Sequence, residues 1–380
     1  PKTLARKSRR HYTVLMDWGS GITYFGTTTL KDVVATFGIK DTDRTGHLAV
    51  VGKPGSGKSA LIAGMCLQDM ERAAGVIVLD ADGEFARVLL ERMDPAARDR
   101  LIFLDPSDGE YPFSWNPLDD FRALGGKDGR DMLSRALASM YRIPLSPLSD
   151  ILAERLIGNV ASSIVTVYDL VTDAEARKKE FGDDLSALAA FEKLLSERPD
   201  DTELVSEHGR YIAKDTLTRN LLGQVASKFA LAAVAAGGIL IADLSRVRMF
   251  PTRIAPLVRV LIHAARARAR AAKTPFMVYL NDTLRSLSEE DVEHLFTDRG
   301  LAFTIADTAV TDADRPVREK ALARCLSIVS LSPAPADLPF VERLFYPYIE
   351  SEELAKLEQG EFALALAIDG VRTRPFFAQS

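Results

Sequence analysis

The sequence predicts an α/β fold built on a mainly parallel sheet, with an all-helical stretch inserted into it. Three observations support this prediction. Short apolar strand patterns alternate with helix patterns up to about residue 124 and again from about residue 236. A glycine-rich loop at residues 52–59 joins one of the first strands to a helix, and residues 125–235 show helix periodicity without a strand-like run. Alternating strands and helices favour a parallel sheet covered on both faces.

The chain begins with a basic stretch, PKTLARKSRR, which carries five positive charges and no negative charge. A phosphate- or lipid-binding arm and a disordered solubilising tail are both consistent with it. Residues 12–29 favour strands, with glycines as turn points, and Leu30 to Phe37 read as one short helix. We therefore expect a basic arm and a small β element in residues 1–36.

The glycine-rich loop reads GKPGSGKS and fits the pattern G-x-x-x-x-G-K-[ST] at every fixed position. A buried-strand pattern precedes it and a helix pattern follows, which is the context that this motif requires. The glycines allow backbone N–H groups to reach phosphate oxygens, and the new helix adds partial positive charge. Lys58 is expected to neutralise the β- and γ-phosphates, and Ser59 to ligate Mg²⁺. The predicted nucleotide-contacting residues are Gly52, Lys53, Pro54, Gly55, Ser56, Gly57, Lys58, Ser59 and Ala60.

Two further strands follow the loop, and each ends at an aspartate. Val76 to Leu79 ends at Asp80, and Leu101 to Leu104 ends at Asp105. For Asp80, a metal contact and a helix-capping role are equally open; for Asp243, after a later strand, a strand-end role is favoured. Residues 105–121 form a long loop rich in proline, aspartate and aromatic residues, and such loops are usually functional. Its aromatics, Tyr111, Phe113 and Trp115, favour packing over stacking on bases.

Residues 125–235 show apolar positions at steps of three and four, which is typical of helices. Strand patterns return at residues 239–244, 276–280, 302–306 and 326–331, and Asp369-Gly370 is a hairpin signal. We expect a nucleotide-binding domain of residues 37–124 and 236–380, interrupted by an all-α domain of residues 125–235.

Composition restricts the function classes. The net charge is −5, so the protein is no polycation, and any nucleic-acid contact must come from local patches. One helical region is rich in basic residues, and a solvated basic helix face is favoured there over a nucleic-acid site. These residues are Arg253, Arg259, Arg266, Arg268, Arg270 and Lys273. The longest apolar run, residues 231–242, is too short to span a bilayer, and no secretory signal is visible. We expect a cytoplasmic or membrane-peripheral protein.

The order of these pieces resembles the conjugative coupling ATPases of type IV secretion, in the HerA–FtsK class of RecA-like P-loop motors. The resemblance covers nearly the whole chain beyond residue 37. Apart from the glycine-rich loop, the matching runs are individually weak, and their order and spacing along the chain make the resemblance specific. The matching runs are FGIKDTDRTGHLAVVGKPGSGKS, VIVLDADGEFARVLLERM, IFLDPSDGEYPFSWNPLDD, GGILIADLS, PFMVYLND, GLAFTIADT, LSIVSLSPAPADLPFVERLF and EQGEFALALAIDGVRTRPF. The resemblance implies a RecA-like core, an inserted all-α domain, and hexameric rings that translocate DNA with ATP and Mg²⁺.

The chain departs from this family at the catalytic positions. Where the family has Asp-Glu at the end of one strand, this sequence has Asn281 and Asp282. Asn281 lacks the charge that helps to hold a divalent cation, and Asp282 is one methylene shorter than the glutamate that polarises water. A shift of one residue would make Asp282 the metal residue, but would place Thr283 at the position of the base.

Two more positions differ. Thr308 stands where the family has a γ-phosphate-sensing glutamine, and about Thr297 where it has a ring-closing arginine, for which Arg299 is the nearby substitute. We therefore expect a P-loop motor subunit with Asn281, Asp282 and Arg299 as catalytic candidates and Ser59 and Asn281 as metal candidates. The alternative is a catalytically weakened structural or regulatory subunit. A kinase-like transferase would need an acceptor-binding lid, and the sequence offers no clear one. The expected partners are ATP, DNA, further copies of the chain in a ring, and membrane-associated secretion or conjugation proteins.

Overall fold

The computed structural model describes residues 21–30, 33–110, 113–247, 251–297, 300–307 and 315–380. The strands are β1 (Ile22–Leu30), β2 (Val33–Lys40), β3 (Leu48–Val51), β4 (Val76–Asp80), β5 (Leu101–Leu104), β6 (Ile239–Asp243), β7 (Phe276–Asn281), β8 (Leu301–Asp307), β9 (Ser327–Ser330), β10 (Glu361–Ala365), β11 (Ala367–Ile368), β12 (Val371–Arg372) and β13 (Phe376–Gln379).

The helices alternate with these strands, except in one long run that contains helices alone. They are α1 (Asp41–Arg44), α2 (Lys58–Glu71), α3 (Glu84–Arg92), α4 (Pro95–Arg98), α5 (Leu118–Leu124), α6 (Gly126–Tyr141), α7 (Pro147–Gly158), α8 (Val165–Thr172), α9 (Ala174–Phe181), α10 (Leu185–Glu197), α11 (Pro199–Lys214), α12 (Thr216–Leu222), α13 (Leu231–Ala235), α14 (Pro251–Ala272), α15 (Glu289–Leu295), α16 (Arg315–Arg324), α17 (Leu338–Phe345) and α18 (Ser351–Ala355). Two short 3₁₀ helices, η1 (Ser245–Val247) and η2 (Leu284–Ser286), follow β6 and β7.

The described residues form one eleven-stranded sheet in the order β2-β1-β13-β10-β9-β3-β8-β7-β4-β6-β5. The strands from β9 to β5 run parallel, and those from β2 to β10 pair antiparallel. The loop strand β3 therefore lies inside the parallel part, between β8 and β9. The predicted fold class, an α/β core with a mainly parallel sheet, an all-helical insertion and N-terminal strands, is confirmed.

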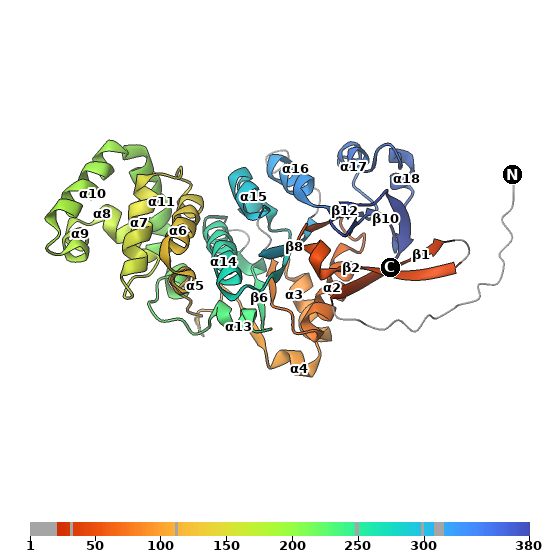
Figure 1. Cartoon of the computed structure of the whole chain (residues 1–380), viewed down its shortest axis with the longest axis horizontal. Coiled ribbons are helices and arrows are strands. Elements are labelled where there is room, and N and C mark those ends of the chain that lie inside the picture. Colours follow the sequence, from red (N-terminus) through yellow and green to blue (C-terminus); the bar gives the residue numbers. More distant parts are fainter. Residues whose placement is uncertain (1–20, 31–32, 111–112, 248–250, 298–299, 308–314) are drawn as a thin grey trace.

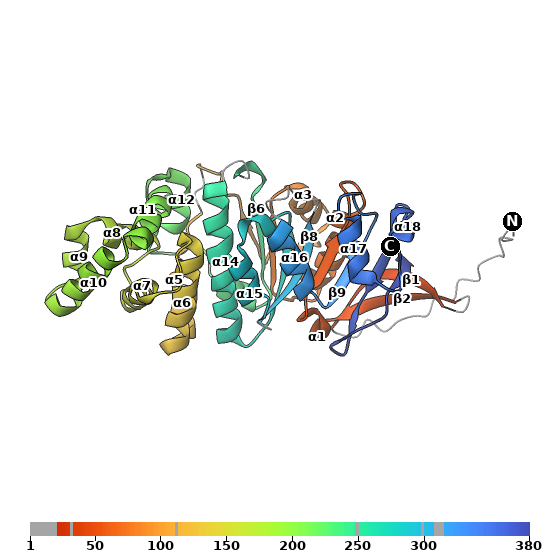
Figure 2. The same cartoon turned by 90° about the horizontal axis from the view of Figure 1, so that it is seen from above.

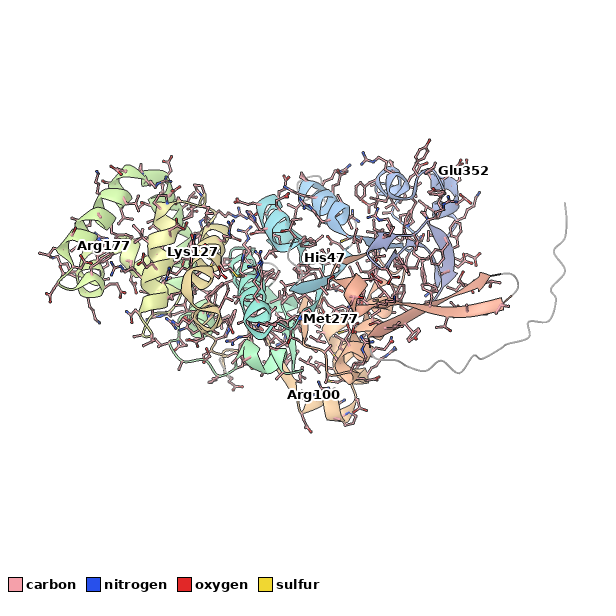
Figure 3. The ribbon with its side chains drawn as sticks, in the orientation of Figure 1. His47, Arg100, Lys127, Arg177, Met277 and Glu352 are labelled. Carbon is pink, nitrogen blue, oxygen red and sulfur yellow. The ribbon has the colours of Figure 1, made fainter. Side chains whose placement is uncertain are left out.

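The molecule is elongated, with the helices α6–α12 at one end and the β1–β2 hairpin at the other (Figures 1 and 2). Lys127 and Arg177 lie in the helical end, whereas His47 and Met277 lie in the part that holds the sheet (Figure 3). The domain boundaries expected from the sequence, 125–235 for the all-α part and 37–124 with 236–380 for the core, remain our proposal. Among the described residues, no helix has the length and apolar character needed to cross a bilayer.

Two hydrophobic layers cover the sheet because alternate side chains of a strand point to opposite faces. Leu48 and Val50 of β3 face the layer that holds α2 and α3. Ala49 and Val51 face the other layer, to which α14, α15 and α16 contribute. This second layer continues through α14 into the helices α5–α12, so the helical part and the sheet share one core.

The short helix expected over Leu30 to Phe37 is wrong. The described residues of this stretch are extended: β2 begins at Val33 and pairs antiparallel with β1, with Lys40 opposite Ile22. Valine and threonine favour strands, and pairing with β1 decides the conformation here. The N-terminal strands join the main sheet through β13, so they extend the core rather than form a separate unit.

His47, just before β3, uses both ring nitrogens while it is neutral. Its Nε2 lies 2.9 Å from the carbonyl oxygen of Phe296, and the backbone N–H of Phe303 donates to its Nδ1 at 3.3 Å. Burial lowers the pKa of His47 to about 4, although the hydrogen bond to Phe296 acts in the opposite direction. Protonation would place a hydrogen on Nδ1, against the N–H of Phe303.

We expect the free energy of unfolding to fall by about 3 kcal/mol from this residue as the pH drops from 6.5 to 4. Folding lowers the pKa of His47, so its stabilising contribution is complete at a pH above the pKa of the unfolded state. The contribution is lost as the pH falls through the pKa of the folded state. Urea unfolding of the wild type and His47→Asn across this range measures it, because asparagine tolerates the positive φ of 63°. Parallel pH profiles for the two proteins would contradict the prediction.

Candidate nucleotide-binding site

The glycine-rich loop connects β3 to α2 at the carboxyl end of the parallel strands. Gly55 and Gly57 have φ values of 75° and 100°, a region that favours glycine. A Cβ on Gly52 would lie 2.5 Å from Ser56 Oγ, so the backbone could not close as tightly there with another residue. The backbone N–H of Lys53 donates to the carbonyl of Ser332 at 2.9 Å, which anchors the loop to the segment after β9.

Lys58 begins α2, and its side chain folds back along the loop. Its Nζ donates to the carbonyl oxygens of Gly52 at 2.9 Å and Lys53 at 3.1 Å, and the residue is only 6% exposed. Burial lowers the pKa of Lys58, while Asp282 and Asp307 act in the opposite direction. The ammonium group is therefore held in the curve of the loop, close to two carboxyl groups.

The loop fits a phosphate group. The first hydrogen bond within α2 runs from the N–H of Leu61 to the carbonyl of Gly57, so the N–H groups of the preceding turn have no acceptor in the helix. Lys53, Pro54, Gly55 and Ala60 are exposed, and Ser59 is half-buried. Ser56 Oγ is buried without a hydrogen-bond partner, and a buried polar atom without a partner is rare in a folded protein. Exposed loop backbone, a buried lysine and an unpaired hydroxyl are the groups that a triphosphate would engage.

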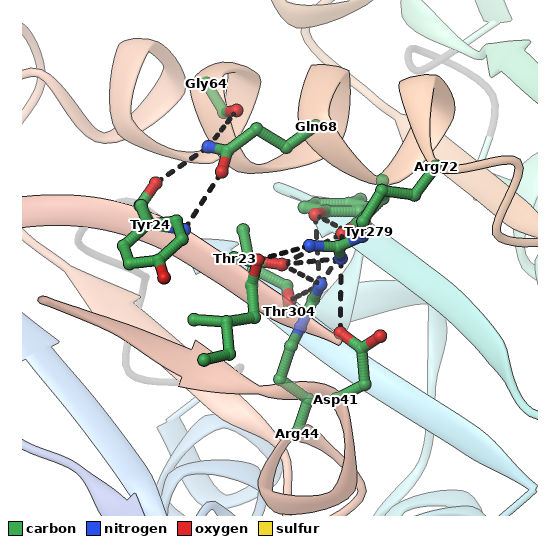
Figure 4. A network of polar contacts seen from close by, with 11 residues as sticks. Thr23, Tyr24, Asp41, Arg44, Gly64, Gln68, Arg72, Tyr279 and Thr304 are labelled. Carbon is green, nitrogen blue, oxygen red and sulfur yellow. Dashed lines mark hydrogen bonds and ion pairs between the residues drawn. The ribbon is translucent and has the colours of Figure 1, made fainter. Parts of the chain in front are cut away.

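A cleft of about 280 Å³ opens beside the loop. One wall is α2, with Leu61 and Gly64, and another is β1, with Tyr24 and Phe25. Leu331, Gln359, Gly360 and Ser380 complete it together with Ser56, Gly57 and Ala60 of the loop region. Figure 4 shows Gln68 of α2 bonded to the backbone of Tyr24 and to Gly64, which fixes the distance between the two walls. The lining is mostly apolar and touches the phosphate loop, as a base-binding cleft requires.

Asn281 ends β7 in a buried position beside Asp80 of β4. Its Nδ2 donates to Asp80 Oδ1 at 2.8 Å. Asp80 also accepts from the backbone N–H groups of Asp82 at 3.0 Å and Ala86 at 2.8 Å, so it caps the start of α3. Of the two roles left open for Asp80, its contacts are those of helix capping. Asp243 accepts from the N–H and hydroxyl of Ser245, in agreement with the favoured strand-end role.

Asp282 directly follows β7. It has a φ of 51°, and its N–H donates to the carbonyl oxygen of Ala306 in β8 at 3.0 Å. Its carboxyl group lies close enough to Asp307 to raise the pKa of Asp307. The structure thus brings together Lys58 and Asp282, which were predicted, with Asp307, which was not.

Two of the remaining candidates, Arg299 and Thr308, lie outside the described residues. Thr297, near the expected ring-closing position, donates from its hydroxyl to the carbonyls of Glu293 and His294 in the preceding helix α15. The catalytic role of Arg299 therefore stays a prediction.

The arginines of α14 are not simply a solvated face. Arg259 is 3% exposed and donates to the carbonyls of Ser286 and Ser139. Arg268 pairs with the buried Asp120 at 2.8 Å. These two side chains hold α14 against its neighbours. Of the loop aromatics, Phe113 and Trp115 pack on Phe229, with ring centroids 4.7 and 5.7 Å away, and Tyr111 lies outside the described residues.

Comparison with known proteins agrees with this geometry. Residues 27–214 match the family described as the central domain of the helicase HerA (DUF87). No curated protein matches the sequence. The unbound monoclinic form of the bacterial conjugative coupling protein TrwBdeltaN70 is similar over 94% of this chain and 88% of its own, at 15% identity and a TM-score of 0.61.

Two further solved structures show the same fold. TrwB in complex with ADP and Mg²⁺ is 16% identical, with coverages of 87% and 85% and a TM-score of 0.55. VirB4 of Thermoanaerobacter pseudethanolicus is 14% identical, with coverages of 96% and 97% and a TM-score of 0.56. The resemblance predicted from the sequence is confirmed: residues 27–214 match the HerA central domain, and the chain shares its fold with the conjugative coupling protein TrwB and with VirB4.

Proposed function

We propose that this chain is an ATP-binding motor subunit of the conjugative coupling type, which moves DNA by hydrolysing ATP as part of a homo-oligomeric ring. The HerA match and the coupling-protein fold support this proposal. TrwB has been solved with ADP and Mg²⁺ and with a non-hydrolysable ATP analogue. The proposed place of action is the cytoplasm or the inner face of the membrane, with secretion or conjugation proteins as partners.

The observation that carries the proposal is the loop, with Lys58 held in its curve and a cleft beside it. The loop backbone and Lys58 would bind the β- and γ-phosphates, and the cleft between α2 and β1 would take the base. Ser59 would hold Mg²⁺, which neutralises charge on the phosphates when it is bound. Asp282, whose carboxyl group acts on the pKa of Lys58, would orient the attacking water, with Asn281 next to it in the chain and Arg299 contributed to a neighbouring subunit.

The rival proposal is a subunit that binds ATP but hydrolyses it slowly, and uses it to hold an assembly. The observation that favours it is Asn281, a neutral residue whose amide is engaged by Asp80. One sample tested for ATP binding and for phosphate release, with and without DNA, separates the two proposals. Turnover above a Lys58→Ala control that rises with DNA supports the motor; binding without turnover supports the rival; absence of binding removes both.

Restoring a carboxylate at Asn281 is expected to be unfavourable unless Asp80 changes with it. Asn281→Asp alone would place two buried carboxyl groups in hydrogen-bond contact, and we expect a loss of about 1–3 kcal/mol in the free energy of unfolding. The exchange Asp80→Asn with Asn281→Asp keeps one acid and one amide, so most of this loss should be recovered. Urea unfolding of both variants measures the difference, and equal stabilities would contradict it.

The same exchange tests the rival proposal when Asp282→Glu is added. If the missing charge limits hydrolysis, phosphate release should rise in this triple variant while ATP affinity hardly changes. Unchanged turnover at unchanged affinity would mean that Asn281 does not limit the reaction.

Gly64 offers a test of the cleft that leaves the phosphate loop intact. It lies on α2 in the lining, and a Cβ there would meet nothing within 4 Å. Gly64→Ala should stabilise the helix by about 0.5–1 kcal/mol and leave ATP affinity unchanged. Gly64→Leu should extend into the cleft and weaken ATP binding by roughly tenfold, because overlap costs about 1–3 kcal/mol. Calorimetric titration of both variants checks this, and equal affinities would exclude the cleft as the base site.

A further inference from the structure

The strand order places β8 next to the strand that leads into the phosphate loop, which the sequence alone does not show. β8 lies between β3, which leads into the phosphate loop, and β7, which ends at Asn281. Asp307, the last residue of β8, is in register with Val51, the last residue of β3. Neighbouring strands are about 4.8 Å apart, so the end of β8 is one strand from the loop strand and the end of β7 is two. A carboxylate at the end of β8 is therefore expected to lie closer to phosphates bound at the loop than a carboxylate at the end of β7.

Asp307 is buried without enough partners. It is 6% exposed, and its Oδ2 has no hydrogen-bond partner. Burial and the contact with Asp282 raise its pKa well above its usual range, although Arg318 acts in the opposite direction. Arg318 itself is paired with Asp337 at 2.7 Å, and its Nε is also unpartnered. A buried, unpaired carboxylate oxygen is unfavourable unless a cation or a polar ligand completes it.

The backbone around Asp282 holds this arrangement in place. A positive φ is uncommon for a residue with a side chain, and it is tolerated best by aspartate and asparagine. The hydrogen bond from the N–H of Asp282 to Ala306 ties the turn to β8, beside Asp307. Both carboxyl groups act on the pKa of Lys58, which places them within electrostatic range of the phosphate loop.

We propose that Asp307 and Asp282 form the carboxylate pair that holds the nucleotide-bound Mg²⁺, with Asp307 supplying, from the neighbouring strand, the charge that Asn281 lacks. This inference rests on the proposed nucleotide binding. The pair carries two carboxylates, as many as an Asp-Glu pair would. Two adjacent carboxyl groups favour a cation between or near them, and Mg²⁺ keeps several of its waters, so contact through water is sufficient.

The test compares ATP affinity with Mg²⁺ and with EDTA, by titration calorimetry, in the wild type and Asp307→Asn. Asparagine has the same shape, so the fold should be retained. We expect the gain in affinity that Mg²⁺ gives the wild type to shrink by about 10–100-fold in the variant. Affinity in EDTA should stay the same or rise, because a negative charge near the phosphates is lost.

Asp243→Asn is the matched control, since this strand-end carboxylate lies on β6, four strands from β3, and should leave the Mg²⁺ dependence unchanged. If Asp307→Asn does not fold, the half-buried Asp282→Asn takes its place with the same expectation. If the variant gains as much ATP affinity from Mg²⁺ as the wild type does, the proposed carboxylate pair is wrong. Wild-type protein that binds no ATP in either buffer overturns the proposed function instead.

Discussion

Lys58→Ala is expected to lower the affinity for ATP by roughly 10- to 100-fold and to remove phosphate release. A hydrogen bond to a charged group contributes about 1.5–3 kcal/mol, and Lys58 Nζ is held within the loop by two backbone carbonyls, where phosphate oxygens would replace them. Alanine takes away the only buried cation of the loop itself, residues 52–59, which are all described. Calorimetric titration with ATP and Mg²⁺ measures the affinity.

Lys53→Ala is the matched control for this experiment. Lys53 belongs to the same loop and carries the same charge, but it is exposed, and its hydrogen bonds with Ser332, Ser56 and Lys58 are made by its backbone. Its replacement should change affinity by much less than that of Lys58. Equal losses in the two variants would mean that overall charge, rather than the position of Lys58, determines binding.

Asp69→Ala is expected to lower the free energy of unfolding by about 3–5 kcal/mol, because it leaves a buried arginine without its counter-ion. Asp69 Oδ2 accepts from Arg44 Nη1 at 2.5 Å and from the hydroxyl of Tyr279 at 2.6 Å. Its Oδ1 accepts from Thr23 at 3.0 Å and Arg72 at 2.6 Å. Arg44 and Asp69 are 1% and 0% exposed. Figure 4 shows Arg44 bonded to Thr23, Tyr279 and Thr304 in this network. The network ties the C-terminal end of α2 to β1, α1 and β7.

Urea unfolding measures this loss, and two comparisons sharpen it. Glu91→Ala breaks the exposed pair with Arg87, whose side chains are 57% and 58% exposed, and should cost less than about 1 kcal/mol. Arg44→Met combined with Asp69→Leu removes both charges, so it should cost less than the sum of the single substitutions. A loss for Asp69→Ala no larger than that for Glu91→Ala would show that the buried pair contributes little.

The parts of this protein that sequence predicted are those that depend on neighbouring residues. The phosphate loop follows from eight consecutive positions, and the hairpin at Asp369-Gly370 from two, whose φ values of 51° and 79° suit that turn. Asp80 could be given two roles from sequence, and its contacts with Asp82 and Ala86 agree with the local one.

The parts that sequence did not predict depend on contacts between distant positions. Asn281 meets Asp80 across 201 residues, and nothing in either local pattern shows this. Asp307 was passed over because its importance comes from the position of β8 beside β3. The stretch ending at Phe37 is extended because β1 pairs with it. The charge pattern of α14 gave no sign that Arg268 would meet Asp120, 148 residues away.

The shared core has a consequence for cooperativity. α14 contacts α5, α6 and α11 of the helical part and also β8 and α15 of the sheet part, so it packs against both parts of the molecule (Figure 2). The helical part and the sheet both bury apolar side chains against α14, so neither part can unfold without exposing α14. Denaturant should therefore unfold the helical end and the sheet in a single transition, reported alike by far-ultraviolet circular dichroism and by tryptophan fluorescence.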